Sequence, residues 1–148
     1  MLHLKTAKLA RWQSRLLCWS GGILWVSGIV WLVLHNFGQV KGEFGPEANP
    51  AEPWMLRIHG AAMIAALLGA GSLLVVHIWR GWGYRSQRVL GVVLTSVVAA
   101  LILSGYLLYY VGDEDLRSWI SIVHWVVGIV LLPIFMLHYL RGQRIRRS

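Results

Sequence analysis

The 148-residue sequence is poor in charge, since only 14% of its residues are Asp, Glu, Lys or Arg, whereas 57% are hydrophobic. A water-soluble helical domain carries a polar stripe along each helix, and the long apolar stretches of this chain have almost none. The composition therefore excludes an ordinary soluble globular domain. Cys18 is the single cysteine, which excludes an intrachain disulfide and any Cys-x-x-Cys motif.

Four apolar stretches fill most of the chain, at residues 16–35, 54–79, 89–111 and 118–140. Each has the roughly 20 residues that a helix needs to cross a hydrocarbon core, and in lipid each must be helical to pair its backbone groups. We therefore expect an all-α protein: a four-transmembrane-helix, up-down bundle that forms one integral-membrane domain over residues 1–148. The first stretch is too long for the core of a signal peptide, and no small-residue cleavage site follows it before His35, so it is expected to be retained.

The connections between the stretches differ in length. The segments 81–88 and 112–117 are short, which favours antiparallel packing of the helices that they join. The segment 36–53 is the longest and contains three glycines and three prolines, so we predict an irregular loop there.

Acidic residues are scarce, six against fourteen Lys and Arg, and they are confined to one side of the expected membrane protein. Eleven basic residues precede the first stretch, lie between the second and third, or follow the fourth. All six acidic residues lie in or beside the other two connections, together with only three basic ones. The positive-inside rule then places both termini in the cytoplasm. The basic charge thus reflects topology, and no nucleic-acid partner is expected.

Histidines recur in the second and fourth stretches. His59 and His77 are eighteen residues apart, and His124 and His138 are fourteen apart, so each pair lies on nearly one helical face. Counted from the outer ends of the stretches, His59 and His124 lie about 8 and 11 Å deep, and His77 and His138 about 35 and 32 Å. The spacing therefore predicts two facing histidine pairs at two membrane levels.

Two imidazoles facing each other inside a membrane bundle are the axial ligands that a haem iron takes. We predict two haems b, because no covalent attachment motif is present, one held by His59 and His124 outside and one by His77 and His138 inside. Zinc is disfavoured, since no intramembrane carboxylate and only one cysteine accompany the histidines.

Further residues flank the predicted ligands. Gly128 lies one turn below His124 and would give a flat cofactor room, although small residues equally let bare helices pack closely. Four arginines are in reach of haem propionates and are equally typical of membrane boundaries: Arg57 and Arg117 outside, Arg80 and Arg141 inside. His35 ends the first stretch and leaves three interpretations open: an alternative outer ligand, a hydrogen-bond partner of a quinol, or an interfacial helix end.

With His59 and the fourteen-residue spacing of His124 and His138, nearly the whole chain resembles small bacterial di-haem membrane cytochromes. These are the cytochrome b561-like group, which includes the cytochrome b subunits of formate dehydrogenase and hydrogenase. The resemblance implies haem b at both faces of the bacterial inner membrane, and electron transfer involving the quinone pool. The chain departs from the family in the segment "QSRLLCWS", which lacks the histidine that usually supplies an inner ligand, and His77 would take that role.

The expected function is therefore an electron-transfer subunit that is not catalytic alone. It would carry electrons through two haems between the quinone pool and a periplasmic redox protein, such as a c-type cytochrome, that docks on the acidic outer loops. Two alternatives remain open: a cofactor-free membrane anchor of a larger complex, and a haem or metal carrier.

Overall fold

The structure is a computed structural model that describes residues 10–73 and 88–147. Its elements are α1 (Arg11–Phe37), β1 (Val40–Gly42), β2 (Gly45–Glu47), α2 (Glu52–Leu73), α4 (Arg88–Tyr110) and α5 (Glu114–Arg147). All four of these helices are long and apolar enough to cross a membrane. The predicted all-α fold with four membrane-spanning helices is confirmed, and such helices expose their apolar side chains to membrane lipid.

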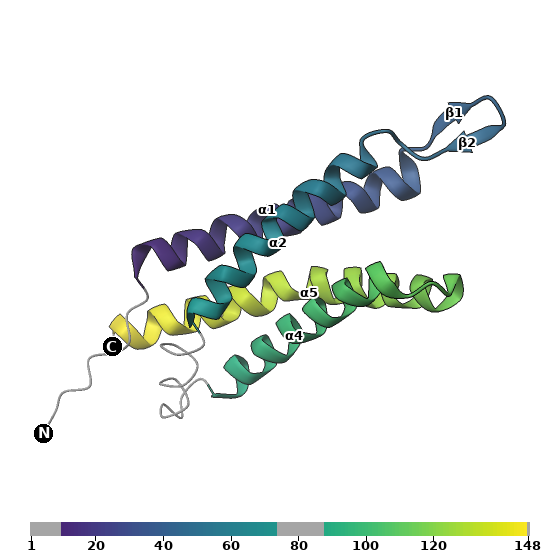
Figure 1. Cartoon of the computed structure of the whole chain (residues 1–148). Coiled ribbons are helices and arrows are strands. Elements are labelled where there is room, and N and C mark those ends of the chain that lie inside the picture. The colour runs from purple at the N-terminus through teal and green to yellow at the C-terminus, as the bar shows by residue number, and fades with distance from the viewer. Residues whose placement is uncertain (1–9, 74–87, 148) are drawn as a thin grey trace, which may run out of the picture. The chain divides into compact units, whose positions relative to one another are not determined.

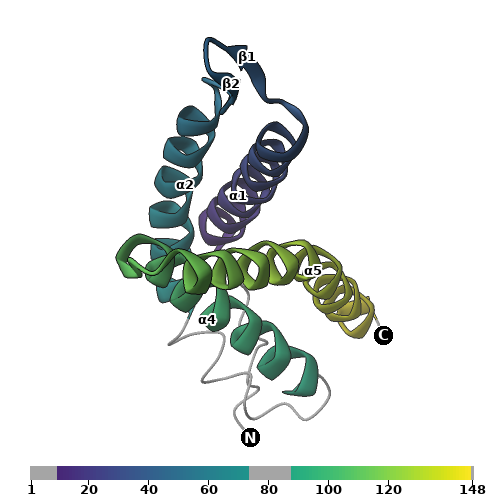
Figure 2. The same ribbon diagram turned by 90° about the vertical axis from the view of Figure 1, so that its right-hand side faces the viewer.

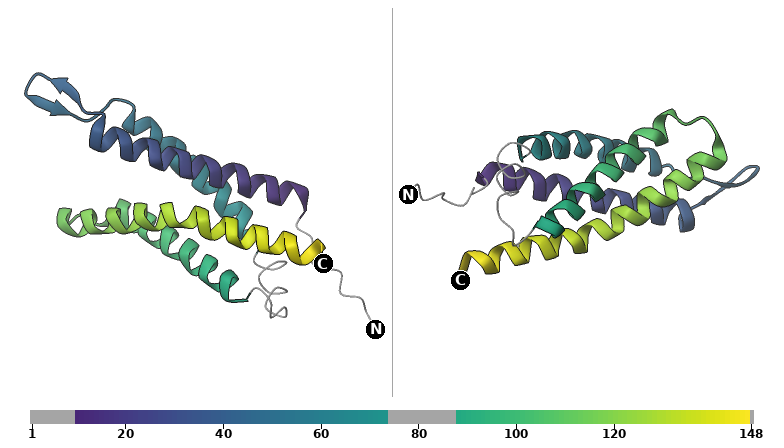
Figure 3. Two further views of the ribbon diagram at one scale, coloured as in Figure 1. Left: turned by 180° about the vertical axis from the view of Figure 1, so that it is seen from behind. Right: turned by 90° about the horizontal axis from the view of Figure 1, so that it is seen from below.

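The chain divides after residue 80 into two compact units. In the first, α1 and α2 run side by side in opposite directions and form what we call hairpin 1 (Figure 1; Figure 2). In the second, α4 and α5 form hairpin 2 in the same way (Figure 3). The antiparallel packing predicted for the helices on either side of segment 112–117 is confirmed, whereas most of segment 81–88 lies outside the described residues.

Helix bounds follow the apolar stretches closely for α4 and less closely for α5. The predicted stretch 118–140 stops short of both ends of α5, which extends from Glu114 to Arg147. At its start, Asp113 caps the helix, because its Oδ1 accepts a hydrogen bond from the amide of Leu116 at 2.7 Å. At its end, Arg and Gln are good helix formers, so the helix continues beyond the apolar residues.

The prediction of an irregular loop over segment 36–53 is wrong for the central part of the segment. Strands β1 and β2 pair antiparallel there, and Gly42 lies opposite Gly45 (Figure 1). Gly45 has a φ of 132°, a backbone conformation that residues with a Cβ rarely adopt. Sequence reasoning missed this short pairing because its prolines and glycines are typical of loops.

Small and polar side chains line the helix interfaces. The buried residues in the described helices are all polar or small: Gln13, Ser20, Ser27, Glu52, Ala62, Gly69 and Ser104. Large apolar side chains point outward instead, as expected where lipid rather than a protein core covers them. In α1 the buried polar residues recur every seven positions, which places Gln13, Ser20 and Ser27 along one stripe.

Candidate functional site

His59 of hairpin 1 contacts α1 through a serine and a glycine. Its Nδ1 lies 3.0 Å from the Oγ of Ser27, which is buried. The next residue, Gly28, has no side chain to keep the imidazole away, and a Cβ there would lie 3.4 Å from the Cε1 of His59. The imidazole therefore lies directly against the α1 backbone.

His124 of hairpin 2 has the same surroundings on α4. Its Nδ1 lies 2.8 Å from the Oγ of Ser104, which is also buried. A Cβ on the following residue, Gly105, would lie 3.3 Å from the Cε1 of His124. Both hairpins thus hold a histidine of the second helix against a Ser-Gly pair of the first.

The serine hydroxyls determine which ring nitrogen carries the proton. A hydroxyl has one hydrogen to donate, and the hydroxyls of Ser27 and Ser104 donate it to the carbonyl oxygens of Ile23 and Ala100, at 2.6 and 2.7 Å. Each serine oxygen must then accept its second hydrogen bond from the histidine Nδ1–H. In a neutral imidazole with its proton on Nδ1, the electron pair that can bind a metal is on Nε2.

A hydrogen bond from Nδ1–H is also a feature of histidines that bind a metal through Nε2. Ligating histidines commonly donate their other ring N–H to a nearby acceptor, which fixes the tautomer and raises the basicity of the ligating nitrogen. Sequence analysis predicted His59 and His124 as a matched pair but missed both serines. The signal was present, because "SG" occurs in each first helix, at 27–28 and at 104–105.

Both histidines lie toward the ends of the hairpins where α1 meets α2 and α4 meets α5. His59 is seven residues into α2 and His124 ten residues into α5, or about 10 and 15 Å along the helices. His138 is half-buried on the same side of α5 as His124, about 21 Å further along. The predicted pairing of His59 with His124 joins the two hairpins and stays a prediction.

The remaining predicted site residues fall into three groups. His77 and Arg80 lie outside the described residues. Gly128 lies on the α4-facing side of α5, where a Cβ would be 3.8 Å from Leu101, and so has room near His124. The arginines Arg57, Arg117 and Arg141 are exposed, and the guanidinium of Arg57 lies 4.7 Å from the ring centre of Trp54.

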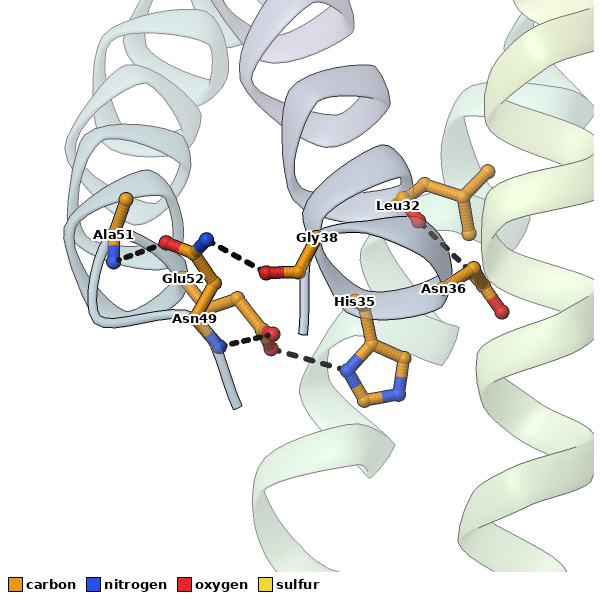
Figure 4. Close-up of polar contacts among 7 residues, drawn as sticks. All are labelled: Leu32, His35, Asn36, Gly38, Asn49, Ala51 and Glu52. Carbon is orange, nitrogen blue, oxygen red and sulfur yellow. Dashed lines mark hydrogen bonds and ion pairs between the residues drawn. The ribbon is translucent and has the colours of Figure 1, made fainter. Parts of the chain in front are cut away.

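His35 takes part in a polar contact that we call the latch, formed by His35, Asn49 and Glu52 (Figure 4). The buried carboxylate of Glu52 accepts hydrogen bonds from His35 Nδ1 at 3.0 Å and from the backbone N–H of Asn49 at 3.2 Å. The Asn49 side chain donates to the carbonyl of Gly38 at 2.7 Å. The latch therefore ties the end of α1 to the start of α2, with the His35 side chain 54% exposed.

Glu52→Ala is expected to destabilise hairpin 1 by about 1–3 kcal/mol, because it removes the acceptor of two hydrogen bonds, one of them from the Asn49 backbone amide in the turn before α2. Unfolding of the detergent-solubilised protein by SDS, followed by circular dichroism, measures this loss. Glu43→Ala is the matched control, since Glu43 is exposed in the β-turn. Equal stability of the two variants would contradict a structural role for the latch.

One observation and one property of haem bear on whether the site could hold a cofactor. In the described ranges 10–73 and 88–147, no three His, Cys, Asp or Glu side chains gather into a group that could hold a metal ion. A haem iron needs only axial ligands from the protein, because the macrocycle supplies the other four nitrogens. The donor set of each hairpin, one imidazole with its proton held on Nδ1, fits an axial ligand.

Comparison with known proteins adds no further identification. The chain matches no protein-family model, and no curated protein or solved structure is significantly similar to it.

Proposed function

We propose that the protein is a membrane-embedded b-type cytochrome that carries electrons across the bacterial inner membrane through two bis-histidine haems. His59 and His124 would hold the outer haem, and His77 and His138 the inner one. Electrons would pass between the quinone pool and a periplasmic redox protein. The subunit would act with partners rather than as an enzyme alone.

The observation that carries this proposal is the repeated contact between a histidine and a Ser-Gly pair. It occurs once in each hairpin, with Nδ1–Oγ distances of 3.0 and 2.8 Å. Buried polar groups are costly in a membrane protein and are commonly functional. Two histidines with the same surroundings, one on each hairpin, would supply the two axial ligands that one haem requires.

Bound haem would supply a one-electron carrier at each level, and the chain would determine where that carrier lies and how strongly it is held. Ser27 and Ser104 keep the proton on Nδ1, so that Nε2 is the ligating atom. Gly69 packs closely against Leu17 of α1, and Gly128 contacts Leu101 of α4, so these small residues let the two helices of each hairpin approach each other.

Exposed charged residues could contact the haem propionates and a redox partner. Arg57 and Arg117 would donate hydrogen bonds to the propionates of the outer haem, and Arg80 and Arg141 to those of the inner one. The acidic residues Glu43, Glu47, Asp113, Glu114 and Asp115 are exposed near the helix ends that the proposed topology places outside. Their negative charge would steer a basic periplasmic redox protein to the outer haem.

The purified protein is expected to contain two haems b per chain. Pyridine haemochrome analysis with a protein determination gives this ratio, and a reduced-minus-oxidised visible spectrum shows whether both haems are low-spin. A chain without haem would contradict the proposal and favour a cofactor-free anchor. A ratio of one would retain only one histidine pair.

A further inference from the structure

The start of α1 carries a basic and aromatic surface that the proposed electron transfer does not use. A shallow, open surface is formed there by five residues that we call the inner patch: Arg11, Trp12, Arg15, Leu16 and Trp19. Both tryptophans are largely exposed, at 59% for Trp12 and 74% for Trp19. Side chains this large and apolar are normally covered in a folded protein or by lipid.

The arginines and tryptophans of the inner patch lie on the side of α1 away from α2, whereas Leu16 borders α2, where a Cβ on Gly69 would lie 3.5 Å from its Cδ2. Arg11 and Arg15 are four residues apart and so are neighbours on one side of the helix. The adjacent Gln13 is buried and its side chain donates a hydrogen bond to Ser72 of α2 at 3.1 Å, which defines the packed side of α1. The guanidinium groups and indole rings of these residues are therefore exposed on the outside of hairpin 1.

No carboxylate within hairpin 1 is close enough to neutralise these arginines. The first 42 residues contain no Asp or Glu, and Glu43, Glu47 and Glu52 follow the opposite end of α1. From Arg15 to Phe37 the helix extends about 33 Å. The positive charge of the patch is therefore not neutralised within the hairpin and can attract an anion from outside it.

We propose that the inner patch binds the headgroup of an anionic phospholipid. Arg11 and Arg15 bind the phosphate through charge-assisted hydrogen bonds, which guanidinium groups make in pairs. Trp12 lies at the headgroup level, where tryptophan is favoured. Trp19, two turns further along the helix and 74% exposed, contacts the start of an acyl chain, which distinguishes a lipid from a free phosphate ion.

Binding can be measured by titrating dioleoyl phosphatidylglycerol into the full-length, detergent-solubilised protein and counting bound lipid by native mass spectrometry. The double variant Arg11→Gln/Arg15→Gln is expected to bind the lipid about 30-fold more weakly, at roughly fivefold for each arginine near a membrane surface. Phosphatidylcholine should bind weakly to both proteins. Circular dichroism of the variant checks that it is folded, and Arg11→Lys/Arg15→Lys should recover part of the binding.

A matched control removes the same charge elsewhere. Arg88→Gln/Arg144→Gln lowers the net charge by two at the starts and ends of other helices and should leave lipid binding unchanged. An equal loss in this control, or no loss in the Arg11/Arg15 variant, would overturn the proposal. Displacement of the lipid by an excess of inorganic phosphate would also overturn it, because the patch would then be a site for free anions. Haem content should be the same in all of these variants.

Discussion

Replacing His59 or His124 with alanine is expected to remove the outer haem and leave the inner haem largely intact. Each histidine would supply one of the two axial ligands of the same iron, so that loss of either leaves a site with half of its protein ligands. The haem-to-protein ratio should fall from two to about one. Redox titration of the visible bands should then lose one of its two components.

Changes at the other level serve as the reciprocal test. His77→Ala or His138→Ala should remove the inner component and spare the outer one. His35→Ala should spare both, because the imidazole of His35 binds the Glu52 carboxylate. If His35→Ala abolished the outer haem while His59→Ala spared it, the assignment of the outer pair would be wrong.

The helices were predictable because lipid imposes a simple rule on sequence. A long uncharged stretch in a bilayer must be helical, and the start of α4 at Arg88 lies within one residue of the start predicted from the apolar stretch. The ends of α5 were less predictable, because both lie outside the apolar stretch. Asp113 caps the start of the helix, and the helix continues through the C-terminal arginines. The strand pairing of Gly42 with Gly45 was missed for a related reason: three residues per strand give too little pattern to detect.

The candidate site was predictable on one helix of each hairpin only. Histidine in an apolar stretch is rare, so the similar depths of His59 and His124 in their stretches could be read from the sequence. Serine and glycine are common in membrane helices, so Ser27 and Ser104 could be connected with the histidines only after the helices were packed. The carboxylate partner of His35 was hidden for the same reason, since seventeen residues separate His35 from Glu52.

Ser27→Ala and Ser104→Ala are each expected to weaken retention of the outer haem about 10- to 100-fold, as loss of the acceptor behind a ligating histidine commonly does. Without the serine oxygen, the imidazole loses one of its hydrogen-bond partners and is less firmly held in the tautomer that ligates through Nε2. The ligand also becomes less basic, which should raise the midpoint potential of the outer haem. Transfer of haem to an excess of a haem-scavenging protein measures retention, and redox titration measures the potential.

Ser20→Ala is the matched control for these changes. Ser20 is buried in α1 like Ser27, and its hydroxyl donates to the Leu16 carbonyl at 2.7 Å in the same way, but it lies seven residues away from Ser27. If Ser20→Ala released haem as fast as Ser27→Ala, the loss would reflect helix packing rather than the histidine contact. Because Ser27 and Ser104 would support opposite ligands of one iron, their single variants should change the same redox component. A change in two different components would instead place His59 and His124 on separate haems.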